Sequence, residues 1–237
     1  MIKKILVGLL TLVSIQITSF AEDTTPITEE QIAQEQSIQS RINDIGSKLL
    51  NANKIDKRII FVYDEQAKDT FLKINPELTR RQVVVYGSEY KFIQNDDELA
   101  AYLARGILIT AKSYEGLFNG YLSAFELKAA PKKFELAADK RAVDFMVNAG
   151  YHPVGLITFI QKSCPQKRFD RFSNKNLTSK RLAHIYEYIY AKYPYYLANN
   201  PYYENEHYQN FLLTSMKNRK MLEEKIKSGS KEELPYE

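Results

Sequence analysis

The spacing of apolar residues predicts a mainly helical chain with two short strands. Apolar positions recur every three or four residues over 28–49 and 96–112, which is typical of helices with one buried face. Continuous apolar runs at 58–63 and 81–87 predict strands, with a turn at Asn75-Pro76 between them. Further helices are expected over 121–129, 133–149, 154–162 and 179–193, then a last helix through 211–226 and a frayed tail at 228–237.

Two glycines lie at different points of the predicted helices. Gly150 follows the helix expected at 133–149 and is predicted to be its C-cap. Gly106 lies in the middle of the helix at 96–112, beside Arg105, where a glycine costs about 1 kcal/mol relative to alanine. A residue that is tolerated there at such a cost requires a local reason.

The first residues predict a signal peptide over 1–21. Lys3 and Lys4 precede an apolar run at 5–17, and Ser19-Phe20-Ala21 supplies the small residues of a cleavage site after Ala21. A membrane anchor is the rival interpretation, but the run is shorter than the roughly 20 apolar residues that a span needs. We therefore expect a periplasmic or secreted protein with no membrane span after cleavage.

Net charge and cysteine content bear on two further questions: whether the protein binds nucleic acid and whether it contains a disulfide. Removing Lys3 and Lys4 from 33 basic residues leaves 31 against 29 acidic ones, a net charge of +2 that gives no reason to expect nucleic acid as a partner. Cys164 is the only cysteine, so an internal disulfide is excluded. With no recognisable partner residues it suits a buried thiol better than a nucleophile.

Four motifs occur in an order that resembles a known family. They are Asp97–Ala104 (DELAAYLA), Glu135–Asp144 (ELAADKRAVD), Ala149–Pro153 (AGYHP) and the Thr178-x-x-Arg181 element. Together they make residues 58–190 similar to gluzincin peptidase family forty-eight, the HtpX-like, prenyl-protease-like and BepA-like zinc endopeptidases. The resemblance implies an α+β fold, a mainly helical metallopeptidase-like domain with a small β-sheet at 58–193. An N-terminal helix at 22–57 would precede it, and a tyrosine-rich segment with a C-terminal helix at 194–237 would follow.

The chain departs from that family where zinc would bind. The positions of the family's His-Glu-x-x-His are Arg105, Gly106 and Ile109, while the third ligand maps onto Glu135 and a supporting carboxylate onto Asp139. A catalytic zinc needs three protein ligands, and one carboxylate does not hold it. Without the metal and the glutamate, nothing activates a water molecule. We therefore expect no zinc, no other cofactor and no zinc-dependent proteolysis, and Gly106 is interpreted as a position that faced a substrate cleft before its chemistry was lost.

The remaining residues of the expected cleft are Arg105, Glu135, Asp139, Arg181 and His184. Arg105 either pairs with Glu135 or Asp139, so that a salt bridge replaces the metal between two helices, or points solvated into an open cleft. Arg181 is expected to pair with one of the same carboxylates, although Lys175-Asn176 replace the His-Pro that many relatives carry nearby.

The histidines do not restore a metal site. His184 is the only one with a plausible path to the cleft, and a structural role suits it better. His152 is expected in a solvated loop and His207 on a polar surface. No pair of histidines four residues apart exists among the three.

Tyrosines crowd the chain from residue 186 to residue 208. Their rings are expected to pack against the core and cap the cleft, or to bind an extended peptide that adds to the strand at 81–87. The favoured function is an exported pseudopeptidase that binds protein or peptide, with envelope protein quality control as a setting suggested by the family. The alternatives are an active metalloendopeptidase with a non-standard site, and a structural or interaction protein without a peptide cleft.

Overall fold

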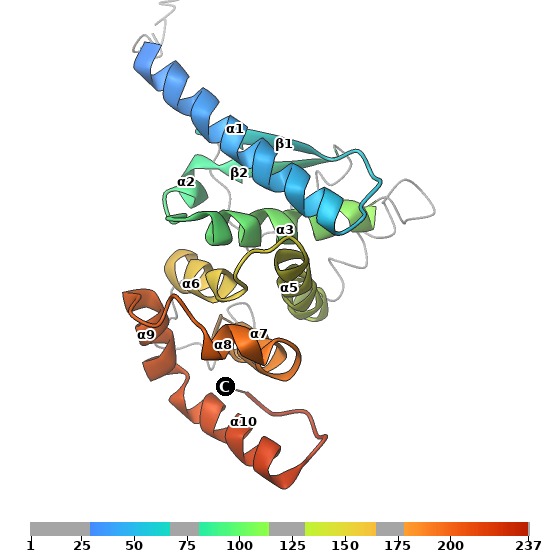
Figure 1. Ribbon diagram of the computed structural model, residues 1–237, viewed down its shortest axis with the longest axis vertical. Coiled ribbons are helices and arrows are strands. Elements are labelled where there is room, and N and C mark those ends of the chain that lie inside the picture. Colours follow the sequence, from blue (N-terminus) through green and yellow to red (C-terminus); the bar gives the residue numbers. More distant parts are fainter. Residues whose placement is uncertain (1–28, 67–80, 114–130, 165–177, 237) are drawn as a thin grey trace, which may run out of the picture.

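A computed structural model describes residues 29–66, 81–113, 131–164 and 178–236 (Figure 1). The expected signal peptide, the turn at 75–76, the helix at 121–129 and Lys175-Asn176 lie outside these residues. The described elements are α1 (Glu29–Ala52), β1 (Ile60–Asp64), β2 (Gln82–Tyr86), α2 (Gly87–Tyr90), α3 (Asp96–Ser113), α5 (Pro131–Asn148), α6 (Val154–Ser163), α7 (Thr178–Lys192), α8 (Pro194–Ala198), α9 (Glu206–Thr214) and α10 (Met216–Ser228).

The described chain is mainly helical with a small sheet, which confirms the coarse α+β expectation. β1 and β2 pair in parallel, with Ile60 opposite Gln82 and Asp64 opposite Tyr86. β2 lies within its expected range of 81–87, and β1 extends one residue past its expected range of 58–63, to Asp64. None of the helices in the described ranges is long and apolar enough to cross a membrane.

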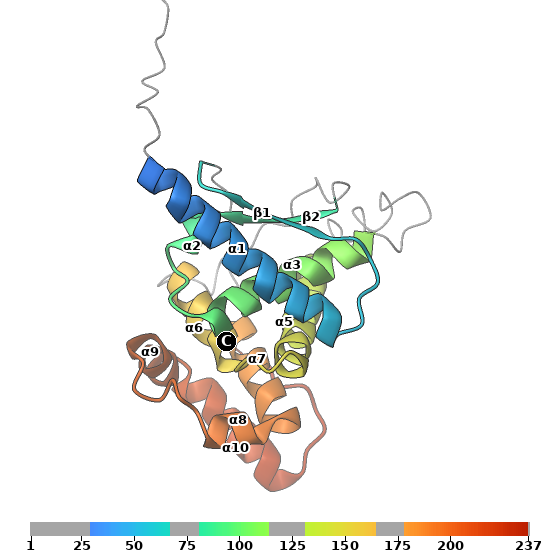
Figure 2. The ribbon, with the colours of Figure 1, turned by 45° about the horizontal axis from the view of Figure 1, so that its top comes forward.

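Two helices cover the same face of this sheet, and each does so through a glycine (Figure 2). Phe61 of β1 and Val83 of β2 are register partners, so their side chains point to one face. Gly46 of α1 lies against the Phe61 ring, and Gly106 of α3 lies against Val83. Small residues at these points allow both helices to approach the strands closely.

α3 is the centre of the core. It packs against α1, α5, α6 and β2, and its apolar stripe at Leu99, Leu103 and Ile107 is fully buried. α5 ends at Asn148, and Gly150 follows with a φ of +75°, the left-handed conformation expected of a C-cap. The amide of Tyr151 then donates to the Met146 carbonyl at 2.9 Å, which confirms the predicted helix end.

The C-terminal part differs from expectation in two ways. The predicted last helix is divided at Ser215 into α9 and α10. The tail is not frayed throughout, because Tyr236 is only 3% exposed. The apolar period identified the helical content here, but neither the break nor the buried ring has a signal in that period.

Candidate functional site

Three helices bring four charged side chains together in the interior. Arg105 comes from α3, Glu135 and Asp139 from α5, and Arg181 from α7. Glu135 and Asp139 are four residues apart, which places them on one face of α5. The side chains of Arg105, Asp139 and Arg181 are at most 3% exposed and that of Glu135 is 13% exposed. We call these four residues the ion cluster.

The contacts within the ion cluster decide between the two expectations for Arg105. Its Nη2 contacts Oε2 of Glu135, and its Nε donates to Oδ1 of Asp139 at 3.2 Å. The prediction of a bridge between the helices is thus confirmed, with both carboxylates engaged at once. The alternative of a solvated Arg105 is wrong, because the side chain is buried.

Arg181 holds the same carboxylates from the other side. Its Nε and Nη2 donate to Oδ2 and Oδ1 of Asp139 at 2.7 and 2.8 Å, a bidentate arrangement that gives the strongest form of this pair. Its Nη2 also lies 3.9 Å from Oε2 of Glu135. The expected structural pairing of Arg181 is therefore confirmed, and Asp139 is shared between two guanidinium groups.

The ion cluster balances two positive and two negative charges. Burial by itself would raise the pKa of Asp139, but Arg181 and Arg105 outweigh it and hold this pKa below its ordinary 3.8. The pKa of Arg105 is lowered to about 10, mainly by burial and secondly by repulsion from Arg181. Arg105 therefore remains charged at neutral pH. Every member has an opposite charge beside it, and this is what makes the burial of such groups tolerable.

Gly106 faces the sheet and not the ion cluster. One turn before it Tyr102 donates its hydroxyl to the Val84 carbonyl at 2.9 Å, and one turn after it Thr110 donates to the Gln82 carbonyl at 3.4 Å. A Cβ at position 106 would stand 2.5 Å from Cγ1 of Val83. The interpretation of Gly106 as a former cleft position is wrong in this structure, because close packing of α3 on β2 requires the glycine.

The same hydroxyls occupy the outer edge of β2. The Ile60 amide bonds to the Arg81 carbonyl, so alternation along the strand turns the carbonyls of Gln82 and Val84 away from β1. These are the two carbonyls that Thr110 and Tyr102 bind. A peptide adding to this edge would have to displace both hydroxyls, which argues against strand addition at β2.

Four of the five residues of the expected cleft thus meet, and the fifth has other partners. The His184 ring meets the Tyr236 ring edge-to-face with centroids 4.9 Å apart, and its Nδ1 lies 3.9 Å from Oε2 of Glu187. Burial and nearby lysines lower the pKa of His184. A structural role, as expected, fits these contacts.

The other two histidines also make local contacts. His152 is half-buried, with its ring 5.0 Å from that of Tyr196 and 5.6 Å from that of Tyr202. The expectation of a solvated His152 is therefore wrong. His207 lies 3.2 Å from the exposed Glu206 carboxylate, in keeping with a polar surface.

The residues present do not fit a catalytic zinc. Arg105 directs its guanidinium at Glu135, the one ligand that the resemblance leaves in place. Among the described residues, no group of three or more His, Cys, Asp and Glu side chains could hold a metal ion. The arrangement can therefore cross-link helices, but its groups are already paired and supply neither a Lewis acid nor a free base.

A second buried polar group was not anticipated. Glu98 is fully buried and accepts hydrogen bonds from the Thr158 hydroxyl at 2.8 Å, Lys162 Nζ at 2.6 Å and the Gln94 amide at 2.7 Å. The Asn95-x-x-Glu98 spacing is the signal that could have revealed part of it, since it matches a capping box at the start of α3. Glu98 therefore fixes the start of α3 against α6.

Cys164 is buried near the ion cluster, as expected of an unreactive thiol. Burial raises its pKa, and the nearby Ser163 hydroxyl and Arg181 only partly oppose this effect. A thiol with a raised pKa is a poor nucleophile.

The chain matches no family model, no curated protein and no solved structure in the comparisons made.

Proposed function

We propose that this protein is an exported, catalytically inactive relative of the zinc metalloendopeptidases that acts by binding protein or peptide. The observation that supports it is the direct contact between Arg105 and Glu135. These are the positions to which the resemblance assigns the first and the third zinc ligand.

Two ligands of one zinc ion must each lie about 2 Å from it, so their side chains have to converge from different helices. The side chains of Arg105 and Glu135 likewise meet from two different helices, α3 and α5. A guanidinium at position 105 supplies a fixed positive charge between the carboxylates, where the metal charge would be. The scaffold keeps its cross-link while Gly106 provides no general base.

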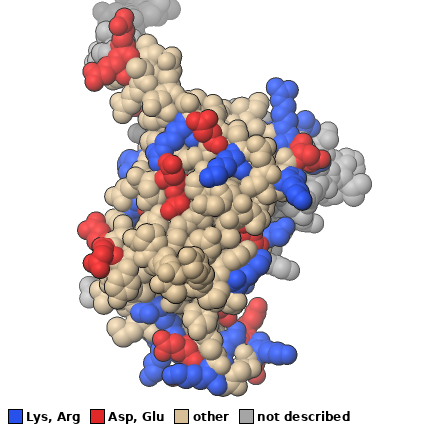
Figure 3. Space-filling model, viewed as in Figure 1, with Lys and Arg blue, Asp and Glu red and all other residues tan. Residues whose placement is uncertain are grey.

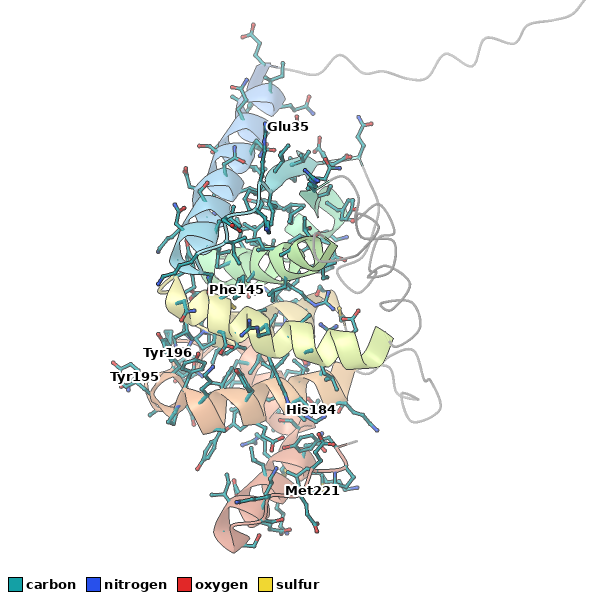
Figure 4. All side chains as sticks on the ribbon, turned by 90° about the vertical axis from the view of Figure 1, so that its right-hand side faces the viewer. Glu35, Phe145, His184, Tyr195, Tyr196 and Met221 are labelled. Carbon is teal, nitrogen blue, oxygen red and sulfur yellow. The ribbon has the colours of Figure 1, made fainter. Side chains whose placement is uncertain are left out.

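A binding role requires a surface, and the tyrosine-rich segment supplies one. Tyr202 and Tyr208 are buried, in keeping with the expected packing on the core, but Tyr195 and Tyr203 are 69% and 61% exposed. Figure 3 shows few charged side chains over the middle of the face that carries α8, and Figure 4 shows Tyr195 and Tyr196 projecting from it. Tyrosine offers a large contact area at a small entropic cost, which suits protein partners.

The proposal is tested with the purified mature chain and unfolded casein. We expect binding without cleavage, in the presence and in the absence of added zinc. Exchanging Tyr195 and Tyr203 for serine should weaken binding several-fold, whereas the matched exchange of the exposed Leu213 should not.

Two results would overturn this proposal. Chelator-sensitive cleavage of casein would establish the active metalloendopeptidase. Failure to bind unfolded proteins at all would favour a structural or interaction protein without a peptide site.

A further inference from the structure

The last described residues return to the body of the protein. α10 ends at Gly229, with a φ of +65°, and residues 230–233 and 235 are exposed. Tyr236 alone in this stretch is buried, at 3% exposure. The end of the described chain lies against α7, where Tyr236 contacts Glu187 and His184.

Tyr236 is held by specific contacts. Its hydroxyl donates to Oε2 of Glu187 at 3.0 Å, and its ring meets His184 edge-to-face at 81°. Lys225 of α10 donates to the other oxygen of Glu187 at 2.7 Å. Figure 4 shows His184 on α7, facing this part of the chain. We call His184, Glu187 and Lys225 the tail site.

The charges around the tail site complement those of the tail. Lys140 and Lys180 act on His184 as positive charges, and Glu233 of the tail acts on it as a negative one. The tail site thus combines a hydrogen-bond acceptor for a phenol in Glu187, an aromatic contact in His184 and a basic side chain in Lys225. These are the features that recognise a tyrosine-bearing acidic peptide.

We infer that the tail site is a peptide-binding site that the chain closes with its own residues 230–236. The occupant of the open site is a peptide of the same chemistry, with an acidic residue three positions before a tyrosine. This inference goes beyond the proposed function, because the tail site is a different surface from the one that carries Tyr195 and Tyr203 and does not depend on it.

The closure depends on one side chain. Tyr236 supplies the buried ring, while the exposed residues that lead to it lose backbone freedom when the tail docks. Because the tail is part of the same chain, its effective concentration at the tail site is high and it competes with any free peptide. A free peptide gains access when the Tyr236 ring is removed. Removing the Tyr236 ring should therefore open the tail site without disturbing the ion cluster.

The experiment uses the full chain with Tyr236→Ala and a fluorescein-labelled peptide KEELPYE, followed by fluorescence anisotropy. We expect at least tenfold tighter binding to Tyr236→Ala than to the unaltered chain, whose own tail competes. A matched variant at an exposed tyrosine, Tyr203→Ala, should behave like the unaltered chain. Replacing the tyrosine of the peptide by alanine, or adding Glu187→Gln to the opened chain, should abolish the gain.

Equal binding to the opened and unaltered chains, or equal binding of the alanine peptide, would refute the closed site. Circular dichroism on each variant verifies folding, and a chain that stops at Gly229 serves as a second opened form. Sedimentation distinguishes the source of the occupant: a dimer of the unaltered chain that Tyr236→Ala abolishes would assign the tail to a second copy and overturn closure within one chain.

The two proposals fail separately. If the peptide does not bind but casein binding still depends on Tyr195 and Tyr203, only the tail site is refuted. If the peptide binds the opened chain but casein does not bind either form, the binding of unfolded protein fails and the tail site stands.

Discussion

Replacing Arg105 by methionine should destabilise the protein more than any comparable change at the surface. Methionine keeps much of the buried stem but removes the charge. At 3.2 Å and an effective dielectric constant of about 20, the attraction between Arg105 and Asp139 is about 5 kcal/mol before desolvation. Removing one partner of a buried pair typically costs about 3–5 kcal/mol, because the other charge stays buried. Urea unfolding followed by circular dichroism measures this change in the free energy of unfolding.

Two variants make the Arg105 test specific to the ion cluster. Arg41→Met breaks a solvent-accessible ion pair with Asp96. The side chain of Arg41 is 33% exposed and that of Asp96 is 63% exposed, so this change should cost about 0–1 kcal/mol. Combining Arg105→Met with Glu135→Gln removes one positive and one negative charge, so that the remaining Arg181–Asp139 pair has no net charge. The double variant should therefore recover at least about 1 kcal/mol of the stability that Arg105→Met loses. If Arg105→Met costs no more than Arg41→Met, the reasoning that the guanidinium cross-links the helices is refuted.

Two further predictions concern the packing of α3 and the titration of the ion cluster. Gly106→Ala places a Cβ 2.5 Å from Val83 and should destabilise by about 1–3 kcal/mol despite the better helix propensity, and adding Val83→Ala should reverse part of this loss in the same urea assay. Arg181 and Arg105 hold the folded-state pKa of Asp139 below 3.8. The ionised Asp139 therefore contributes its full share to the free energy of unfolding above the unfolded-state pKa, and this share is lost as pH falls through the folded-state pKa. Unfolding measured from pH 6 to pH 2 should show a loss that begins near pH 4, and Asp139→Asn should remove this component, whereas unchanged acid sensitivity in that variant would contradict it.

The helices were predictable because their apolar period follows directly from burial of one face. The helix at 96–112 and the C-cap at Gly150 are confirmed nearly to the residue. The resemblance also placed Arg105 near the correct carboxylates, since Glu135 and Asp139 lie on one face of α5. That Arg105 contacts both at once depends on side-chain positions that no spacing specifies.

Other features required neighbours that are distant in sequence. A glycine at position 106 suits a vacated cleft and a close helix–strand contact equally well, and only the position of Val83 distinguishes them. The burial of Tyr236 was missed because a short polar tail has no periodicity, and its partner Glu187 is 49 residues away. The parallel pairing of β1 and β2 likewise depends on a connection that their apolar runs do not describe.

The central claim is that a buried salt-bridge cluster, and not a metal ion, joins α3 to α5. The most direct measurement is the metal content of the mature protein, determined by elemental mass spectrometry. The protein is purified without chelators from the cells that export it. We predict far less than one zinc ion per chain, unchanged when Glu135 is exchanged for glutamine. One zinc ion per chain that this exchange removes would contradict the account.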